Sequence, residues 1–365
     1  MEKVKLGDIF QYLPKSKLKA GDGKKKGKYK FFTSSNIQDK FIDDFIYDGE
    51  YLIFGTGGKA SINYCNEKFA TSTDNLVVKV SKEFYTKLIY LYFKNDMSKL
   101  EKGFKGASIK HISKQYINEL YIPKYDIQVQ KDIIRQLDKV QEIMDIRTKQ
   151  IEDLDNLIKS QFAEMFGDIN INDKKWNEDI LKNNLSVVGG YAFKSSEFQE
   201  NGIPILRIGN INTGQFRPKD LMFWKEEKSL ENYAIYPDDV LMSLTGTVGK
   251  EDYGNICIIG NEYPKYYLNQ RNAKLNIKET LKKEYISYAL RVPEIKRRLT
   301  GISRGVRQAN ISNKDIENLK LPIPPIELQN QFADFVKKIN KQKFELQKSL
   351  KEVQKLQECL MNKYF

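Results

Sequence analysis

The chain has 365 residues, of which 40% are hydrophobic and 12% aromatic, which is enough for two globular domains and excludes a disordered protein. Its formal net charge of +13 favours contact with a polyanion, either nucleic acid or an acidic membrane face. No apolar run approaches the roughly 20 residues needed to span a bilayer, and the start "MEKVKLGDIF" has no signal-peptide character. We therefore expect a cytoplasmic protein without a membrane partner.

The first part of the chain, residues 1–122, is predicted to form one mixed strand-and-helix domain. The segments "YKFFTSSNI" (29–37) and "DGEYLIFGTGGK" (48–59) are typical of apolar strands, and the second runs into a Gly loop. The segment "LPKSKLKAGDGKKKGKYK" (13–30) carries eight lysines against one aspartate. This density suits phosphate neutralisation, with a solvated loop as the alternative.

A long helix is predicted after "PKYDIQVQKDIIRQL", which begins at Pro123, and we assign residues 123–168 to this first spacer. Its apolar residues follow the 4,3 spacing of a heptad seam, which Arg147 and Gln161 interrupt. An ordinary core helix is the alternative, but the run is much longer than the mean helix of about 11–12 residues. The seam consists of Ile133, Leu137, Val140, Met144, Ile151, Leu154, Ile158 and Met165.

The second half repeats this order, with a mixed domain at 169–321 and a helical segment at 322–365 that begins "PIPPIELQNQFADFV". At a constant offset of 199, Ile117 falls on Ile316, Pro123 on Pro322 and Gln130 on Gln329. A fainter match aligns "IPILRIGNI" (203–211) and "PDDVLMSLTGTVGK" (237–250) with the two strands of the first domain. The sequence therefore predicts an internal repeat.

The second helix carries a seam of its own, which Lys343 and Gln357 interrupt. Polar seam residues commonly fix register, and they could face the partner helix or a third chain. We expect an α+β protein with two mixed α/β domains separated by two long antiparallel coiled-coil helices, related by a pseudo-two-fold repeat. The second seam consists of Phe332, Val336, Ile339, Leu346, Leu350, Val353, Leu360 and Tyr364.

The two helices contribute no net charge, because residues 126–166 hold six basic and nine acidic side chains and residues 326–365 hold eight and five. The positive charge therefore belongs to the two domains. Two related basic domains joined by long helices suit the reading of two short sequences along a duplex.

Residues for catalysis are scarce, since His111 is the single histidine and cannot supply a His-ligated metal pair. The three cysteines are isolated and predicted to be inert packing residues. The loops "GTGGKAS" and "GTVGKED" do not match GxxxxGK[ST] or a Rossmann GxGxxG context, so we interpret them as turns near DNA. We expect no catalytic residue, metal or cofactor in this chain.

Candidate DNA contacts are basic side chains for phosphates and Arg, Asn, Gln or Thr side chains for base edges, all in predicted loops. In the first domain they are Lys24, Lys25, Lys26, Lys59, Thr73, Asn75, Lys105, Lys110 and His111. In the second domain they are Arg207, Asn210, Lys250, Asn269, Gln270, Arg271, Asn272, Arg304, Arg307 and Gln308.

This layout resembles the specificity (S) subunit of type I restriction-modification systems. The resemblance is carried by "ISKQYINELYIPKYDIQVQ" (112–130) and "ISNKDIENLKLPIPPIELQNQ" (311–331), together with the two strand-to-Gly loops. The first copy lacks the double proline of the family pattern, and the resemblance covers essentially the full chain.

The resemblance implies that each variable domain is a target recognition domain for one half of a split DNA sequence. The helices would space these domains and dock methyltransferase (modification) subunits, in two copies. The chain would then be the non-catalytic subunit of an adenine-specific DNA methyltransferase and restriction endonuclease complex, with double-stranded DNA and restriction (translocase/nuclease) subunits as further partners. A stand-alone two-domain DNA-binding protein or coiled-coil adaptor is the alternative.

Overall fold

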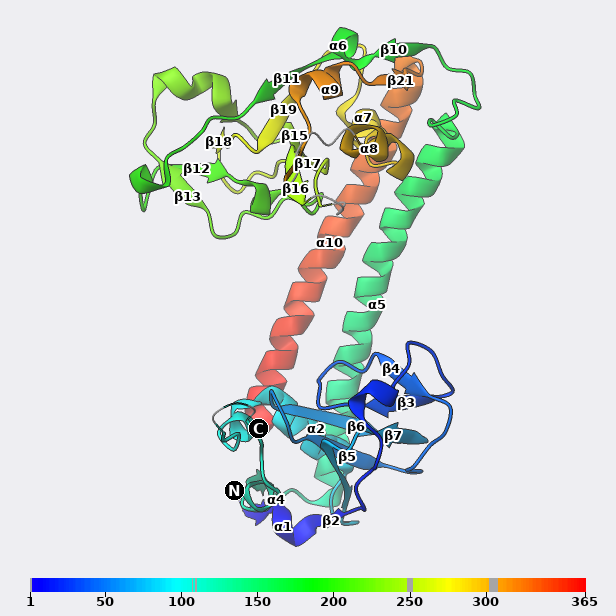
Figure 1. The fold of residues 1–365 in the computed structure, drawn as a ribbon, viewed down its shortest axis with the longest axis vertical. Helices are drawn as coiled ribbons and strands as arrows, with labels where there is room; N and C mark the ends of the chain where they lie inside the picture. Colours follow the sequence, from blue (N-terminus) through cyan, green and yellow to red (C-terminus); the bar gives the residue numbers. More distant parts are fainter. Residues whose placement is uncertain (1, 107, 109, 248–251, 302–307) are drawn as a thin grey trace. The chain divides into compact units, whose positions relative to one another are not determined.

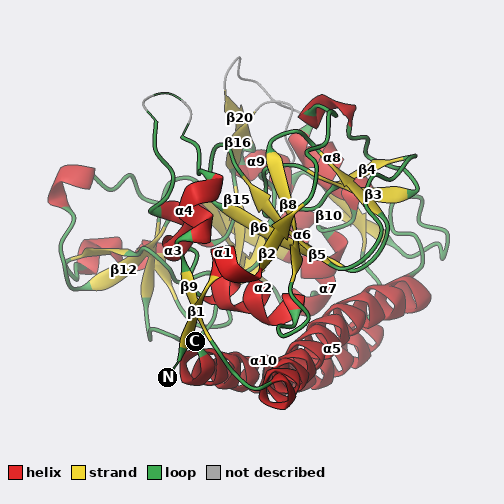
Figure 2. Ribbon diagram, turned by 90° about the horizontal axis from the view of Figure 1, so that it is seen from below, coloured by secondary structure: helices red, strands yellow, loops and turns green. Residues whose placement is uncertain are grey.

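The structure is a computed structural model that describes residues 2–106, 108, 110–247, 252–301 and 308–365. The chain forms two compact units, Met1–Lys149 with Gln347–Phe365, and Gln150–Leu346. Both units mix strands with helices (Figure 2), so the α+β class is confirmed. No helix among the described residues has the length and apolarity to cross a bilayer.

The first unit is built on a four-stranded sheet of order β2-β8-β5-β6 and a three-stranded sheet of order β4-β3-β7. A separate antiparallel pair joins β1 to β9. Figure 1 labels most of these elements. Their bounds are β1 Lys3–Lys5, α1 Leu6–Ile9, β2 Phe10–Tyr12, β3 Tyr29–Phe32, β4 Lys40–Ile42, β5 Tyr51–Gly55, β6 Ser61–Cys65, β7 Phe69–Thr71, β8 Asn75–Val80, α2 Thr86–Asn95, α3 Ser98–Glu101, α4 Lys114–Asn118 and β9 Tyr121–Pro123.

The central strand β5 is apolar on both faces because each face is covered. Successive strand residues point to opposite sides, so Leu52 and Phe54 face one way and Ile53 the other. Leu52 and Phe54 pack in one cluster with Phe93 of α2. Ile53 packs in another with Phe32 of β3. This double coverage explains the continuous apolar run in the sequence.

The second unit repeats the scaffold with sheets of order β11-β19-β15-β17 and β13-β12-β18-β14, and the pairs β10-β21 and β16-β20. The bounds of its strands are β10 Glu178–Ile180, β11 Leu185–Gly189, β12 Ile203–Leu206, β13 Met222–Trp224, β14 Ala234–Ile235, β15 Val240–Ser243, β16 Thr245–Thr247, β17 Ile256–Ile258, β18 Tyr266–Leu268, β19 Asn272–Ile277, β20 Gln308–Asn310 and β21 Lys320–Pro322. Its helices are α6 Leu181–Asn184, α7 Lys283–Ala289, α8 Pro293–Thr300 and α9 Asn313–Glu317, and short 3-10 turns lie at Ser195–Glu197, Ile208–Asn210 and Lys228–Tyr233.

The internal repeat is confirmed element by element. The parallel pairing of β3 with β7 recurs between β12 and β18. In the larger sheets, the pairing of Gly55 with Asn75 recurs as that of Ser243 with Asn272. The aligned segments of the sequence therefore occupy equivalent strands.

The two long helices, α5 (Ile127–Phe166, 40 residues) and α10 (Ile326–Tyr364, 39 residues), each begin after a repeated proline segment. The equivalent glutamines Gln130 and Gln329 are fully buried. Gln130 accepts a hydrogen bond from the Tyr85 N–H at the start of α2, and Gln329 accepts one from the Lys282 N–H at the start of α7, both at 2.9 Å. The repeated glutamine thus ties each long helix to a domain helix.

Within each unit the two helices run antiparallel. In the first unit the Gln357 amide donates to Gln141 at 3.0 Å, and in the second Lys343 forms an ion pair with Asp155. Two of the polar seam residues therefore face the partner helix. The contact residues on α5, at 141 and 155, are 14 residues apart, and so are those on α10, at 343 and 357. This spacing is two heptads on each helix, as expected for residues of one seam.

The buried seam differs from the predicted one near the end of α5. Phe162 and Phe166 are buried and pack edge-on against Phe332, whereas the predicted seam residue Met165 is only partly buried. The difference arises because the domain covers a further side of the helix here. Phe162, for example, stacks on Tyr285 of α7 with ring centroids 5.7 Å apart.

Candidate nucleic-acid interface

In the first unit, the Gly loop after β5 lies beside two other loops that the sequence singled out. The Thr56 N–H donates to the Asp74 carbonyl at 2.8 Å, and the Gly58 N–H donates to the Lys110 carbonyl at 3.0 Å. Gly58 has φ +82°, a conformation that glycine adopts without strain. Three loops from distant parts of the sequence therefore meet at one end of the large sheet.

Most of the predicted contact residues of these loops are exposed. Lys59, Lys105, Lys110 and Thr73 all point side chains to solvent. His111 is also exposed, and its Nδ1 lies 3.1 Å from the Thr56 carbonyl oxygen. The histidine is thus tied to the Gly loop while its ring remains accessible.

The lysine-rich segment joins the same region through the Thr73 N–H, which donates to the Leu18 carbonyl at 2.7 Å. Lys24 forms an ion pair of 2.6 Å with Asp43, and this contact holds the pKa of Asp43 below its ordinary value. Lys25 and Lys26 are exposed, with no ion pair to the residues that the structure describes. These two side chains are therefore available to an outside anion.

Asn75 has a structural role, which corrects its assignment as a base reader. Its side chain is 1% exposed, and its amide donates to the Phe32 carbonyl at 3.2 Å. The same carbonyl accepts the Ser72 N–H at 2.8 Å. Asn75 therefore holds the turn that carries Thr73 against the end of β3.

Asn272 repeats this arrangement in the second unit and is corrected in the same way. It is fully buried, and its amide donates to the Leu206 carbonyl at 2.9 Å. That carbonyl also accepts the Asn269 N–H at 3.3 Å. The turn so held presents Gln270 and Arg271, both of which are exposed.

A concave surface of about 660 Å³ in the second unit gathers five of the predicted residues. Phe193 and Phe198 form its apolar part. Its polar part includes Asp220 and two cations that the sequence analysis missed, Arg217 and Lys219. The predicted residues that line it are Arg207, Asn210, Asn269, Gln270 and Arg271.

Asn210 organises this surface and does not face a ligand, since it is 4% exposed. Its Oδ1 accepts the Arg207 N–H, and its amide donates to the carbonyls of Arg217 and Lys219, all at 2.9 Å. The Arg207 guanidinium donates to the Asp220 carbonyl at 2.8 Å. The long β12–β13 connection is thereby folded back onto the end of β12, which no local sequence pattern indicated.

Three predicted contacts, Lys250, Arg304 and Arg307, lie outside the described residues. Gln308 is placed through its backbone only, opposite Thr247 in the β16–β20 pair. The isolated bridge between Gly57 and His111 occupies the corresponding place in the first unit.

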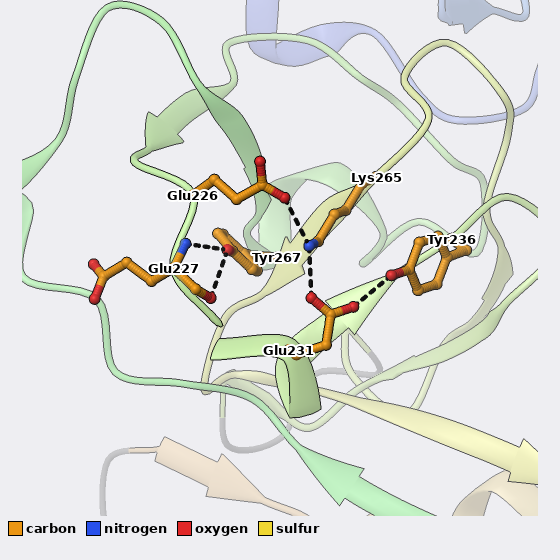
Figure 3. Close-up of polar contacts among 6 residues, drawn as sticks. All are labelled: Glu226, Glu227, Glu231, Tyr236, Lys265 and Tyr267. Atoms are coloured by element: carbon orange, nitrogen blue, oxygen red, sulfur yellow. Dashed lines mark hydrogen bonds and ion pairs between the residues drawn. The ribbon is translucent and has the colours of Figure 1, made fainter. Parts of the chain in front are cut away.

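The Asn269–Arg271 turn follows one end of β18, and an ion-pair cluster lies at the other end. Lys265 binds Glu231 at 2.7 Å and Glu226 at 3.1 Å (Figure 3). The hydrogen bond to Glu231 raises the pKa of Lys265 above its ordinary value. Tyr236 donates to the same Glu231 carboxylate at 2.5 Å, and Tyr267 contacts the backbone of Glu227. These carboxylates are paired internally, so they do not oppose an anion at the concave surface.

Within the part of the chain that the structure describes, no group of His, Cys, Asp and Glu residues is arranged to hold a metal ion. Cys65 and Cys257 are buried, and burial raises the pKa of the Cys257 thiol to about 12, which suits a packing residue. Cys359 is exposed, contrary to the prediction that all three cysteines are packed.

Comparison with known proteins is consistent across sequence and fold. A family model described as "Type I restriction modification DNA specificity domain" matches residues 1–156 and 166–355. The chain is 23% identical over 389 residues to the type I restriction enzyme MjaVIII specificity subunit of Methanocaldococcus jannaschii, covering 99% of this chain and 91% of the relative.

Two solved structures share the fold over the whole chain. The S subunit of a type I restriction-modification system from M. genitalium superposes with a TM-score of 0.67 at 18% identity, covering 100% of this chain and 96% of that one. A chain from a structural study of type I R-M complex assembly gives a TM-score of 0.56 at 16% identity, covering 100% and 97%. The chain therefore belongs to the type I restriction-modification DNA specificity family.

Proposed function

We propose that this specificity subunit reads a bipartite DNA target, with one half-site for each recognition domain, and directs methyltransferase subunits to adenines in that target. The recognition domains are residues 1–122 and 169–321, and the spacers are 123–168 and 322–365. A stand-alone DNA-binding or adaptor protein is less favoured, because the family match spans both halves.

The observation that carries the proposal is the repeated scaffold with different exposed side chains. The buried asparagine holds an equivalent turn in each unit. That turn exposes Thr73 in the first unit and Gln270 and Arg271 in the second. Side chains with different donors and acceptors recognise different base edges, so two related domains would read two different half-sites.

The test is to express the chain with its methyltransferase partner in cells that lack adenine methylation, and to map methylated adenines. The expected result is one split sequence with a constant spacer. The purified chain alone should neither bind S-adenosylmethionine nor methylate DNA, and methyl transfer by the chain alone would contradict the proposal.

The number of methyltransferase copies is proposed to be two, because each unit has a groove at a corresponding place. In the second unit a groove of about 690 Å³ is lined by Lys159 and Phe162 of α5, by Tyr288 of α7 and by Arg291, which follows α7. Its aromatic residues and its arginine belong to residue types that are enriched at protein interfaces.

In the first unit a groove of about 500 Å³ is lined by Glu358 and Met361 of α10, and by Leu91 and Lys94 of α2. Glu358 and Met361 stand 199 residues after Lys159 and Phe162, and Leu91 and Lys94 stand 197 before Tyr288 and Arg291. Equivalent grooves favour two copies of one partner.

Charge reversals at the groove rims test the copy number. Lys159→Glu and Glu358→Lys should each remove one methyltransferase copy from the complex, as measured by native mass spectrometry, and the double variant should remove both. Lys341→Glu and Glu352→Lys change exposed charges on α10 that line neither groove, and should leave the mass unchanged. A wild-type complex with one copy would refute this stoichiometry.

A further inference from the structure

The concave surface of the second unit has an excess of cations at its rim. Four cationic side chains line it, those of Arg207, Arg217, Lys219 and Arg271, against the single carboxylate of Asp220. Among the described residues, no ion pair engages Arg217, Lys219 or Arg271, and all three are exposed. Unpaired cations around a hollow attract an anion strongly.

The rim is held in place before any ligand arrives. Asn210 fixes both ends of the basic loop through its bonds to Arg217 and Lys219 at one end and Arg207 at the other. Because these backbone groups are already ordered, binding loses less conformational entropy than it would with a free loop.

The shape of this surface decides which part of a duplex it fits. Base edges lie at the floor of a groove about 8.5 Å deep, so a reader must protrude toward them. The phosphodiester backbone is a convex ridge, which a concave basic surface can accept. Arg and Lys side chains neutralise phosphates on such a ridge and release counterions.

We propose that Arg207, Arg217 and Lys219 seat the phosphate backbone of the DNA strand beside the second half-site in this hollow. Arg217 and Lys219 provide affinity and orientation, and they do not select the sequence, which is read by other side chains such as Gln270 on the neighbouring turn. This inference rests on the proposed function, since it assigns a phosphate site within the second recognition domain. It also moves Arg207 from the candidate base readers to the phosphate contacts.

The experiment uses the assembled complex of the full chain with its methyltransferase subunits. Binding of Arg217→Ala/Lys219→Ala to a target duplex and to a random duplex of equal length is measured at several salt concentrations. The affinity should fall by the same factor for both duplexes, and the slope of log K against log salt should fall by about 1.8, at about 0.9 for each phosphate that is no longer neutralised. The methylated sequence should stay the same.

The matched control is Lys182→Ala/Lys228→Ala, which removes two exposed charges of the same unit outside the hollow. This control should leave the salt slope closer to the wild-type value than Arg217→Ala/Lys219→Ala does. Equal slopes for the two double variants, or loss of affinity for the target duplex alone, would overturn the phosphate assignment. Failure of the wild-type complex to prefer its target would instead refute the proposed function, so the two failures are distinguishable.

Discussion

The two units place their positive charge on different loops of the same scaffold. In the first unit the loop between β2 and β3 carries Lys24, Lys25 and Lys26, and the loop between β3 and β4 has no basic residue. In the second unit the β11–β12 loop has one lysine, and the β12–β13 loop carries Arg217 and Lys219. A loop is free to change its surface as long as the strands that hold it keep their buried contacts.

The buried contacts themselves are repeated but not identical, which allows a direct test. Phe332 of α10 and Ile133 of α5 stand at equivalent positions, and both are buried. Phe332→Ala should lower the free energy of unfolding of the second unit by about 3–5 kcal/mol, because it removes a buried ring. Ile133→Val should cost the first unit only about 0.5–1.5 kcal/mol.

Urea titration of the full chain, followed by hydrogen exchange in each unit, would measure these changes in stability. Phe344→Ala serves as the control. The Phe344 side chain is 64% exposed, so its removal should change the free energy of unfolding far less. Equal destabilisation by Phe332→Ala and Phe344→Ala would contradict the packing described above.

The twin asparagines sharpen the comparison at the turns. Asn272→Ala removes one of the two hydrogen bonds that the Leu206 carbonyl accepts, and losing one such bond costs about 0.5–1.5 kcal/mol. Because the turn carrying Gln270 is then less restrained, methylation should become less selective at one half-site only. Asn75→Ala should affect the other half-site.

Methylation mapping of both variants decides this prediction. A variant that loses selectivity at both half-sites would show that the asparagine supports general folding and not one reading surface. Unchanged selectivity in both variants would show that the turns do not determine the sequence.

A smaller effect is expected at the lysine-rich loop. Replacing Lys25 and Lys26 by alanine should weaken binding about equally for target and random DNA, and lower the salt slope by about 0.9 for each phosphate that these lysines neutralise. Lys24→Ala should lower the affinity and the salt slope less, because Lys24 is already paired with Asp43. Fluorescence anisotropy at several salt concentrations would measure this, and a changed sequence preference would mean that the loop reads bases.

The sequence predicted the repeat well where buried residues carry it. Ile117 and Ile316, and Gln130 and Gln329, are buried at equivalent positions, so their spacing recorded a structural requirement. The long helices were predictable for the same reason, since the heptad pattern reflects which side chains are covered.

The candidate interface was less predictable because exposure depends on strand pairing. Asn75 and Asn272 have the chemistry of base readers, but pairing with Gly55 and Ser243 buries them. Arg217 was missed because its place depends on Asn210, seven residues away, folding the loop back. Such non-local contacts leave no periodic signal in the sequence.

The central prediction is that the lengths of α5 and α10 set the spacer between the two half-sites. A 40-residue helix is about 60 Å long at 1.5 Å per residue. Inserting one heptad after Gln150 and one after Ser349 would lengthen the helices by about 10 Å, preserve the seam and match about three base pairs.

Methylation mapping in cells that carry this insertion variant with its partner subunits tests the claim most directly. We predict that both half-site sequences stay unchanged and that the spacer between them grows by up to about three base pairs. An active complex with the original spacer, or with altered half-sites, would show that the helices do not set the separation.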